Sequence, residues 1–268
     1  MGFGLLDTLR GTLGDRPQVD PNLAGGLREW LEDGVSPTAA HLRDDQPLRI
    51  SPRHLGAPGG AGTGHRHFPA VSPPLAVRVL VEALFRQWIT VGAIGDPVVD
   101  ALAALRMDGR SHHVADYVRH LPSAERLRVE DEVAGHADVL RQRWPVLPAS
   151  WLPRTRERLT IPLAGGRIVL AGVADLMLGR PSSGRASVCM VGLQTGPDRA
   201  SIHGTRRYLA LLETLRSGAP PFRVATYHST TGEIDTEDVL EASLVEAVRL
   251  TIGAVEQAGR AEGEEGPR

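Results

Sequence analysis

Lysine is absent from this chain of 268 residues, and all 30 basic positions are arginine. This absence excludes Schiff-base catalysis, phosphate-loop lysines and any mechanism that needs an amine with a tunable pKa. Arginine stays charged and offers a planar fork of donors, so it can bind anions but cannot act as a base. Hydrolysis by a metal or a carboxylate, nucleophilic serine or cysteine chemistry, and binding without catalysis remain possible.

Cysteine and uninterrupted apolar runs are also scarce. The single cysteine, Cys189, excludes a disulfide framework and a cysteine-only metal site, and it favours a cytoplasmic location. The longest apolar stretch, residues 76–94, contains charged side chains and therefore predicts an amphipathic helix instead of a membrane span. A net charge of −2 gives no overall attraction to nucleic acid. Exclusive use of arginine, with 30 glycines and 20 prolines, is typical of a GC-rich bacterial genome.

Composition divides the chain into four parts. Residues 1–74 are expected to be an irregular N-terminal segment with a glycine-rich linker, because the run 56–64 cannot hold regular structure. Residues 75–150 are expected to be helical, since apolar side chains recur there every three or four positions. Residues 151–259 are expected to form an α/β unit, and 260–268 a disordered polar tail.

The α/β unit shows alternating strands and one clear helix. Gly165 and Gly166 give a hairpin signal, and Thr236 is expected to cap the last helix. The remaining elements are read from period-two or period-3.6 patterns: strands at 159–163, 167–178, 187–193 and 222–228, and a helix at 200–217.

Three short motifs in this order resemble the PD-(D/E)XK nuclease superfamily, in its RecB-like branch. They are Gly172-Val-Ala-Asp175, Val191-Gly-Leu-Gln-Thr-Gly196 and the helical segment that ends at Tyr208, which in the family usually read G-x-x-D, D-x-K-T-G and Q-x-x-x-Y. The segment 50–55 is similar to the Ser-Pro stretch that often opens RecB-like domains. The resemblance implies a core of helix, three-stranded meander, helix, strand and helix, here with an N-terminal helical extension.

In the family, two carboxylates on adjacent strands hold Mg²⁺, which polarises the scissile phosphate, and a lysine two residues after the second acid stabilises charge. If the hairpin turns near residues 183–184, position 192 lies opposite Asp175, and position 194 projects to the same side as position 192. Asp175 and Tyr208 match the family, whereas Gly192, Gln194 and Gly204 replace the second acid, the lysine and the glutamine.

These losses predict a degraded metal site and no cofactor, with Mg²⁺ or Mn²⁺ required only if activity survives. Asp175 is then either a remaining metal ligand or a strand residue whose carboxylate accepts backbone hydrogen bonds. Glu130 or Glu132, on the helix before the sheet, could supply a replacement acid. Helical acids are more often a solvated face.

Other candidate groups are less specific. The pairs His65 with His67 and His112 with His113 lack the spacing of a zinc motif, and Cys189 lies within an apolar strand, where a thiol is inert. Arg199, Arg206 and Arg207 are candidates for binding the phosphates of nucleic acid, or they form an ordinary solvated helix face.

The leading hypothesis is a pseudoenzyme: a nuclease-fold protein without catalysis that binds DNA or a protein partner. The first alternative is an active, divergent Mg²⁺- or Mn²⁺-dependent DNA nuclease that uses Asp175 and a relocated glutamate. The second alternative is a protein–protein scaffold built around the helical block. None of these three hypotheses involves a membrane.

Overall fold

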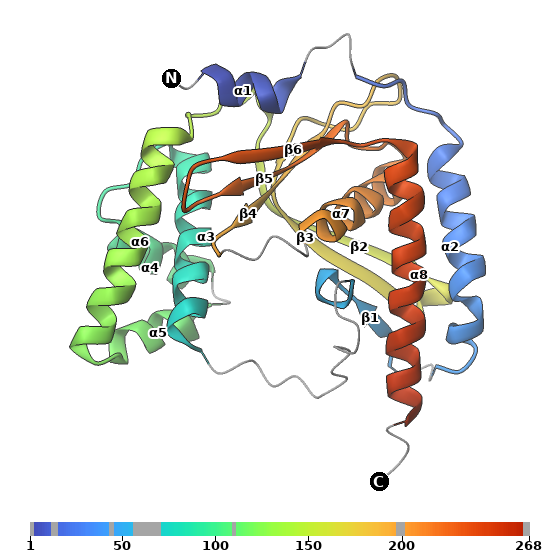
Figure 1. Ribbon diagram of the computed structural model, residues 1–268, viewed down its shortest axis with the longest axis horizontal. Helices are drawn as coiled ribbons and strands as arrows, with labels where there is room; N and C mark the ends of the chain where they lie inside the picture. Colours follow the sequence, from blue (N-terminus) through green and yellow to red (C-terminus); the bar gives the residue numbers. More distant parts are fainter. Residues whose placement is uncertain are drawn as a thin grey trace.

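The computed structural model describes residues 3–11, 16–42, 46–55, 71–108, 111–196 and 202–264. Within these ranges, a mixed sheet of six strands lies between two helical layers (Figure 1). The helices are α1 (Phe3–Arg10), α2 (Leu23–Ala39), α3 (Pro73–Val91), α4 (Pro97–Asp108), α5 (His112–His120), α6 (Ser123–Arg143), α7 (Ile202–Ser217) and α8 (Glu241–Glu264). The strands are β1 (Leu48–Ile50), β2 (Arg154–Leu163), β3 (Ile168–Leu178), β4 (Cys189–Gln194), β5 (Arg223–His228) and β6 (Ile234–Asp238).

The expected element order is present from α6 to β5. Strands β2, β3 and β4 form an antiparallel meander, and α7 carries the chain over to β5, which pairs with β4 in parallel. The predicted start of the last helix was wrong. Thr236 lies in β6, which pairs antiparallel with β5, and α8 begins at Glu241. Pairing along the sheet edge therefore prevails over a local capping signal.

The N-terminal segment is more regular than its composition predicted. The helix α2 buries a stripe of Leu27, Leu31, Val35 and Ala39 in the same core as α7 and α8, and Figure 1 shows α2 beside α8. Strand β1 pairs in parallel with the first residues of β3. Both elements thus belong to the α/β core. The glycine-rich run 56–64 lies outside the described residues, and α8 extends to Glu264, beyond the expected start of the polar tail.

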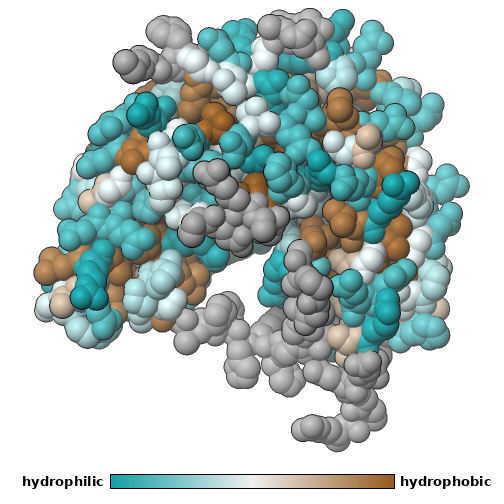
Figure 2. All heavy atoms as spheres, in the orientation of Figure 1, coloured by the Kyte–Doolittle hydropathy of each residue, from teal (hydrophilic) through white to brown (hydrophobic). Residues whose placement is uncertain are grey.

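The residues between 75 and 150 are helical, as expected, and cover the other face of the sheet. Phe85 of α3 packs on Trp144, which follows α6, and on Tyr227 of β5, with ring centroids 5.1 and 6.0 Å from the Phe85 centroid. Leu176 and Val191 of the sheet belong to the same cluster. Figure 2 shows a hollow in the surface between this helical block and the layer that contains α2 and α8. No helix in the described ranges is long and apolar enough to cross a membrane.

Candidate functional site

The pairing of β3 with β4 places positions 175 and 192 as the motif analysis predicts. The observed register ends at Leu176 opposite Val191, so one further step places Asp175 opposite Gly192. A Cβ atom built on Gly192 would have the carbonyl oxygen of Ala225 and Oδ2 of Asp175 as its nearest atoms, each 3.9 Å away. The backbone therefore has room for a side chain at position 192, and the missing second acid is not imposed by steric crowding.

Asp175 closes a gap that opens between the two strands at this point. The backbone N–H of Leu193 donates to Oδ2 of Asp175 over 2.8 Å, in place of a ladder bond to the β3 backbone. This bond ties β4 to β3 just beyond their last regular pair. Asp175 thus has the structural role of a strand residue whose carboxylate accepts a backbone hydrogen bond.

A glutamate from α3 acts on Asp175. Burial and then the negative charge of Glu82 raise the pKa of Asp175 to about 7, against the hydrogen bond from Leu193 and the charges of Arg86 and Arg156. Burial also raises the pKa of Glu82, and Arg86 and Arg156 oppose that rise as well. Two carboxyl groups and two guanidinium groups therefore share one electrostatic environment.

The acid that acts on Asp175 lies on α3 and not on α6. The pKa of Asp175 responds to Glu82 and to neither Glu130 nor Glu132. On α6, Glu130 forms an ion pair with Arg126, with 3.5 Å between Oε1 and Nε, and Glu132 is exposed. These two acids belong to a solvated helix face. One feature of the sequence could have indicated this acid: Glu82 lies inside the apolar stretch 76–94 and is followed four residues later by Arg86.

Arg156 has an unusual backbone conformation directly across the sheet from Asp175. The pairs Thr155 with Leu176 and Glu157 with Ala174 place Arg156 opposite Asp175, and the φ angle of Arg156 is +52°. A left-handed conformation costs a residue with a Cβ about 1–2 kcal/mol. Strained backbone of this kind is concentrated at functional sites, so Arg156 is a functional candidate that sequence reasoning missed.

Asp175 lines a cavity of about 150 Å³ between the sheet and α7. Its polar lining also includes Gln194, Thr205, Arg206 and Thr226. Pro52, from the Ser-Pro segment that resembles RecB-like domains, lies at the same cavity. Residues from five separate stretches of the chain thereby line one cavity, which includes position 192.

Arg206 is buried at this cavity and does not lie on a helix surface. Its side chain is only 6% exposed, and its Nε donates to Oγ1 of Thr226 over 2.6 Å. Its Nη2 lies 3.8 Å from Oδ2 of Asp235, which is too far for a hydrogen bond, and has no hydrogen-bond partner in the described part of the chain. Burial lowers the pKa of the guanidinium. A buried unpaired donor costs about 1–3 kcal/mol, so this nitrogen is a strong candidate for binding an acceptor.

Arg207 is engaged elsewhere. Its Nε donates to Oε1 of Glu237 over 2.8 Å, and its Nη1 donates to Glu246. These bonds raise the pKa of Arg207. Arg206 and Arg207 therefore do not form one basic patch, and Arg199 lies outside the described residues.

Gln194 is built into the end of β4. Its side-chain Nε2 donates to the carbonyl oxygen of Gly196 over 2.9 Å, while its backbone carbonyl oxygen accepts from the backbone N–H and hydroxyl of Ser229. The side chain at the family's lysine position thus bonds to the loop that follows the strand. It also lines the cavity, so it remains within the candidate site.

Strands β1 and β4 pair with different parts of β3, and the side chain of Tyr208 contacts β3 in the interval between them. Its hydroxyl donates to the carbonyl oxygen of Ile50 over 2.9 Å and accepts from the backbone N–H of Ala171 over 3.1 Å. The side chain is 1% exposed, and burial holds the pKa of the phenol above its usual range. Tyr208 stays protonated, so in this structure it positions β1 and does not act as a base.

The rival sites give no alternative centre. His112 and His113 are exposed at the start of α5, and His65 and His67 lie outside the described residues. Burial raises the pKa of the Cys189 thiol to about 12, so the thiol is inert as expected. Within the described ranges, no group of three or more histidine, cysteine, aspartate or glutamate side chains is arranged to hold a metal ion.

Comparisons with known proteins do not assign a family. No protein-family model matches the chain. No curated protein matches it either. A solved structure described as "Crystal structure of SSO0001" aligns with 85% of this chain and 84% of that chain, at 14% sequence identity and a TM-score of 0.32. A likeness this weak carries no argument about fold or function.

Proposed function

We propose that this chain is a PD-(D/E)XK-like protein of RecB-like type that binds the phosphodiester backbone of nucleic acid at the Asp175 cavity and does not cleave it efficiently. The observation that carries the proposal is the buried Nη2 of Arg206, which has no hydrogen-bond partner among the described residues and lies in the same cavity as Asp175 and Gly192. The element order from α6 to β5 supports the nuclease-like scaffold.

The charges around the cavity favour an anion. Arg86 and Arg156 act on Asp175, and Arg206 lines the cavity beside it. Because the pKa of Asp175 is raised to about 7, this carboxyl carries less than a full negative charge near neutral pH. Protonation of Asp175 therefore leaves less negative charge to repel an anion beside Arg206.

The size and donors of the cavity fit a phosphate group. A volume of about 150 Å³ equals the share of about five water molecules in the liquid. This space accepts a phosphate group but not a base pair. Charge-assisted bonds from arginine to phosphate are about twice as strong as neutral ones. Contacts to the phosphate backbone carry no sequence information, so we expect binding that tolerates many sequences.

Binding is best measured by fluorescence anisotropy with labelled single- and double-stranded DNA in EDTA. Affinity should fall steeply between about 50 and 200 mM salt, since arginine contacts release counterions. Arg206→Met keeps the apolar length and removes the donor, so it should weaken binding about tenfold or more. Arg207→Met is the matched control on the same helix and should leave affinity unchanged.

A second variant keeps the proposal testable if Arg206→Met does not fold. Asp175→Asn removes a negative charge from the cavity while the amide oxygen still accepts from Leu193, so it should strengthen DNA binding in EDTA. Weaker binding by this variant would count against the anion site. Absence of any salt-sensitive binding would favour the protein–protein scaffold instead.

A divergent metal-dependent nuclease is the second candidate, and the effect of Glu82 on Asp175 favours it. Mg²⁺ is often held by one or two carboxylates together with waters and substrate phosphates, and these two residues could hold it in that way. The ion would polarise the phosphate and lower the pKa of an attacking water. Arg156 and Arg206 would then neutralise charge in place of the family's lysine.

This second candidate requires metal-dependent behaviour that the first does not. Mn²⁺ should raise the melting temperature of the wild type, because a ligand that binds only the folded state stabilises it, and Glu82→Gln should abolish the rise. DNA cleavage in Mn²⁺ should disappear in Asp175→Asn. If neither a thermal shift nor cleavage is observed, the nuclease candidate is refuted and only the binding function remains.

A further inference from the structure

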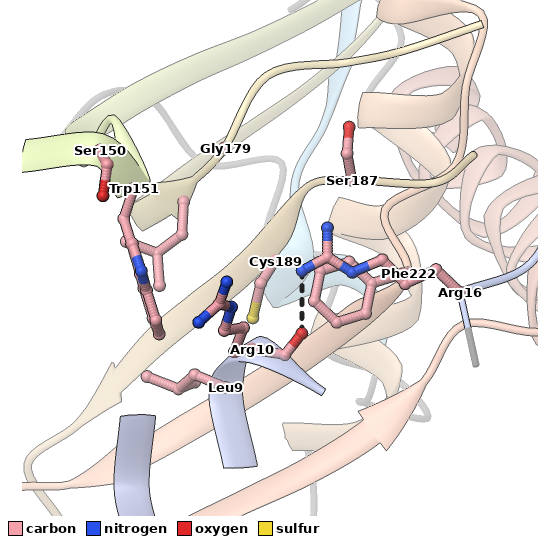
Figure 3. A pocket seen from close by; sticks show the side chains of 10 residues that line it. Leu9, Arg10, Arg16, Ser150, Trp151, Gly179, Ser187, Cys189 and Phe222 are labelled. Carbon is pink, nitrogen blue, oxygen red and sulfur yellow. Dashed lines mark hydrogen bonds between the residues drawn. The ribbon is translucent and has the colours of Figure 1, made fainter. Parts of the chain in front are cut away.

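A second, larger cavity of about 280 Å³ lies at the hairpin end of β3 and β4 (Figure 3). Cys189 of β4 lines it, three residues before Gly192. Because side chains alternate along a strand, positions 189 and 192 project to opposite faces of the sheet. The two cavities therefore lie on opposite faces, and the inference drawn from this one does not depend on the proposed function.

The walls of this cavity are largely apolar, with two aromatic rings. Figure 3 shows Trp151 on one side, Phe222 on the other, and the side chain of Arg10 between them. Leu9 and Leu178 add aliphatic surface. Apolar and aromatic walls with a few polar groups are characteristic of small-molecule sites, and the volume is near the lower end of their usual range.

Arg16 is held in a fixed orientation at this cavity. Its guanidinium carbon lies 4.3 Å from the centroid of the Phe222 ring, and its Nη2 donates to the backbone carbonyl oxygen of Arg10 over 2.9 Å, the bond dashed in Figure 3. Its Nε is buried and has no hydrogen-bond partner. Stacking and the backbone bond thus fix the position of a donor that nothing in the described chain uses.

Positive charge is in excess here. Burial lowers the pKa of Arg16, and the positive charges of Arg10 and Arg223 lower it further. Arg223 has its own partner, Asp238, with Nη2 and Oδ1 2.7 Å apart. No ion pair joins Arg10 or Arg16 to an acid of the described ranges. An anion bound between these two arginines would relieve their repulsion.

We infer that this cavity binds a small molecule that carries an anionic group on a flat aromatic body, such as an aryl phosphate or aryl carboxylate. The anion accepts from Nε of Arg16 and lies beside Arg10, while the ring packs between Trp151 and Phe222. Ser150 and Ser187 also line the cavity, and the hydroxyl of Ser187 already donates to the carbonyl oxygen of Arg180.

Isothermal titration calorimetry with phenyl phosphate as the probe tests this inference directly. We expect saturable binding to the wild type. Inorganic phosphate supplies the charge without the ring, and phenol the ring without the charge, so each should bind at least about tenfold more weakly.

Arg16→Gln should raise the half-saturating concentration of phenyl phosphate about tenfold or more, through the loss of a charge-assisted bond. Arg158→Gln, at an exposed position on β2, is the matched control and should behave as the wild type. Unchanged affinity of Arg16→Gln for phenyl phosphate would overturn the inference. If that variant does not fold, the wild type alone tests the inference: no binding of phenyl phosphate, or equal binding of inorganic phosphate, would overturn it as well.

Discussion

Replacing Asp175 by asparagine should stabilise the protein at alkaline pH. The folded state raises the pKa of this carboxyl from 3.8 to about 7, chiefly by burial and then by the charge of Glu82. Between these two values the folded state holds a proton that the unfolded chain has released. The free energy of unfolding therefore falls as pH rises from about 4 to 7, and the cost persists above pH 7. The amide of asparagine does not ionise, so the variant escapes this cost.

The size of the effect follows from the pKa difference. At 1.36 kcal/mol per pKa unit, a rise from 3.8 to about 7 corresponds to at most about 4 kcal/mol. Asp175 is partly exposed, and solvent screening reduces this ceiling, so we expect about 1–2 kcal/mol. The hydrogen bond from Leu193 is kept, since the amide oxygen can accept it. The amide oxygen accepts a weaker hydrogen bond than the carboxylate does. The resulting loss in the free energy of unfolding is the same at every pH, so it does not alter the dependence on pH.

Urea unfolding followed by tryptophan fluorescence at pH 5 and pH 8 measures this difference. The stability of Asp175→Asn relative to the wild type should be higher at pH 8 than at pH 5 by about 1 kcal/mol. Asp33→Asn, at an exposed position of α2, is the control and should show no such change. Glu82→Gln should lower the pKa of Asp175, as observed by NMR titration. The same relative stability at both pH values, or a lower one at pH 8, would refute the reasoning.

Two further substitutions test the site. Tyr208→Phe leaves the N–H of Ala171 and the carbonyl of Ile50 without a partner, so unfolding in urea should show a loss of about 1–3 kcal/mol for each group. A total loss below about 0.5 kcal/mol would contradict the bridging role. Gly192→Asp adds a carboxylate where a Cβ has 3.9 Å of space from Asp175 Oδ2, so Mn²⁺ should raise its melting temperature more than that of the wild type. An equal response of both proteins to Mn²⁺ would contradict this placement.

The sequence alone determined the features that depend on local pattern. Alternation along β3 and β4 and a symmetric hairpin were sufficient to place position 192 opposite Asp175, because pairing in a hairpin follows from its turn. The helical stripe that contains Phe85 and the inert state of Cys189 followed in the same way. The absence of lysine is also a property of the sequence, and no folding can supply one.

Only the tertiary structure decided which distant residues meet. Glu82 and Asp175 are more than ninety positions apart, and their proximity depends on how α3 packs against the sheet. The burial of Arg206 and the bridge made by Tyr208 depend likewise on where α7 crosses β5 and β1. Periodicity specifies which face of an element is apolar, but not which element covers that face, so the chemistry of the cavity could not be predicted before the packing was known.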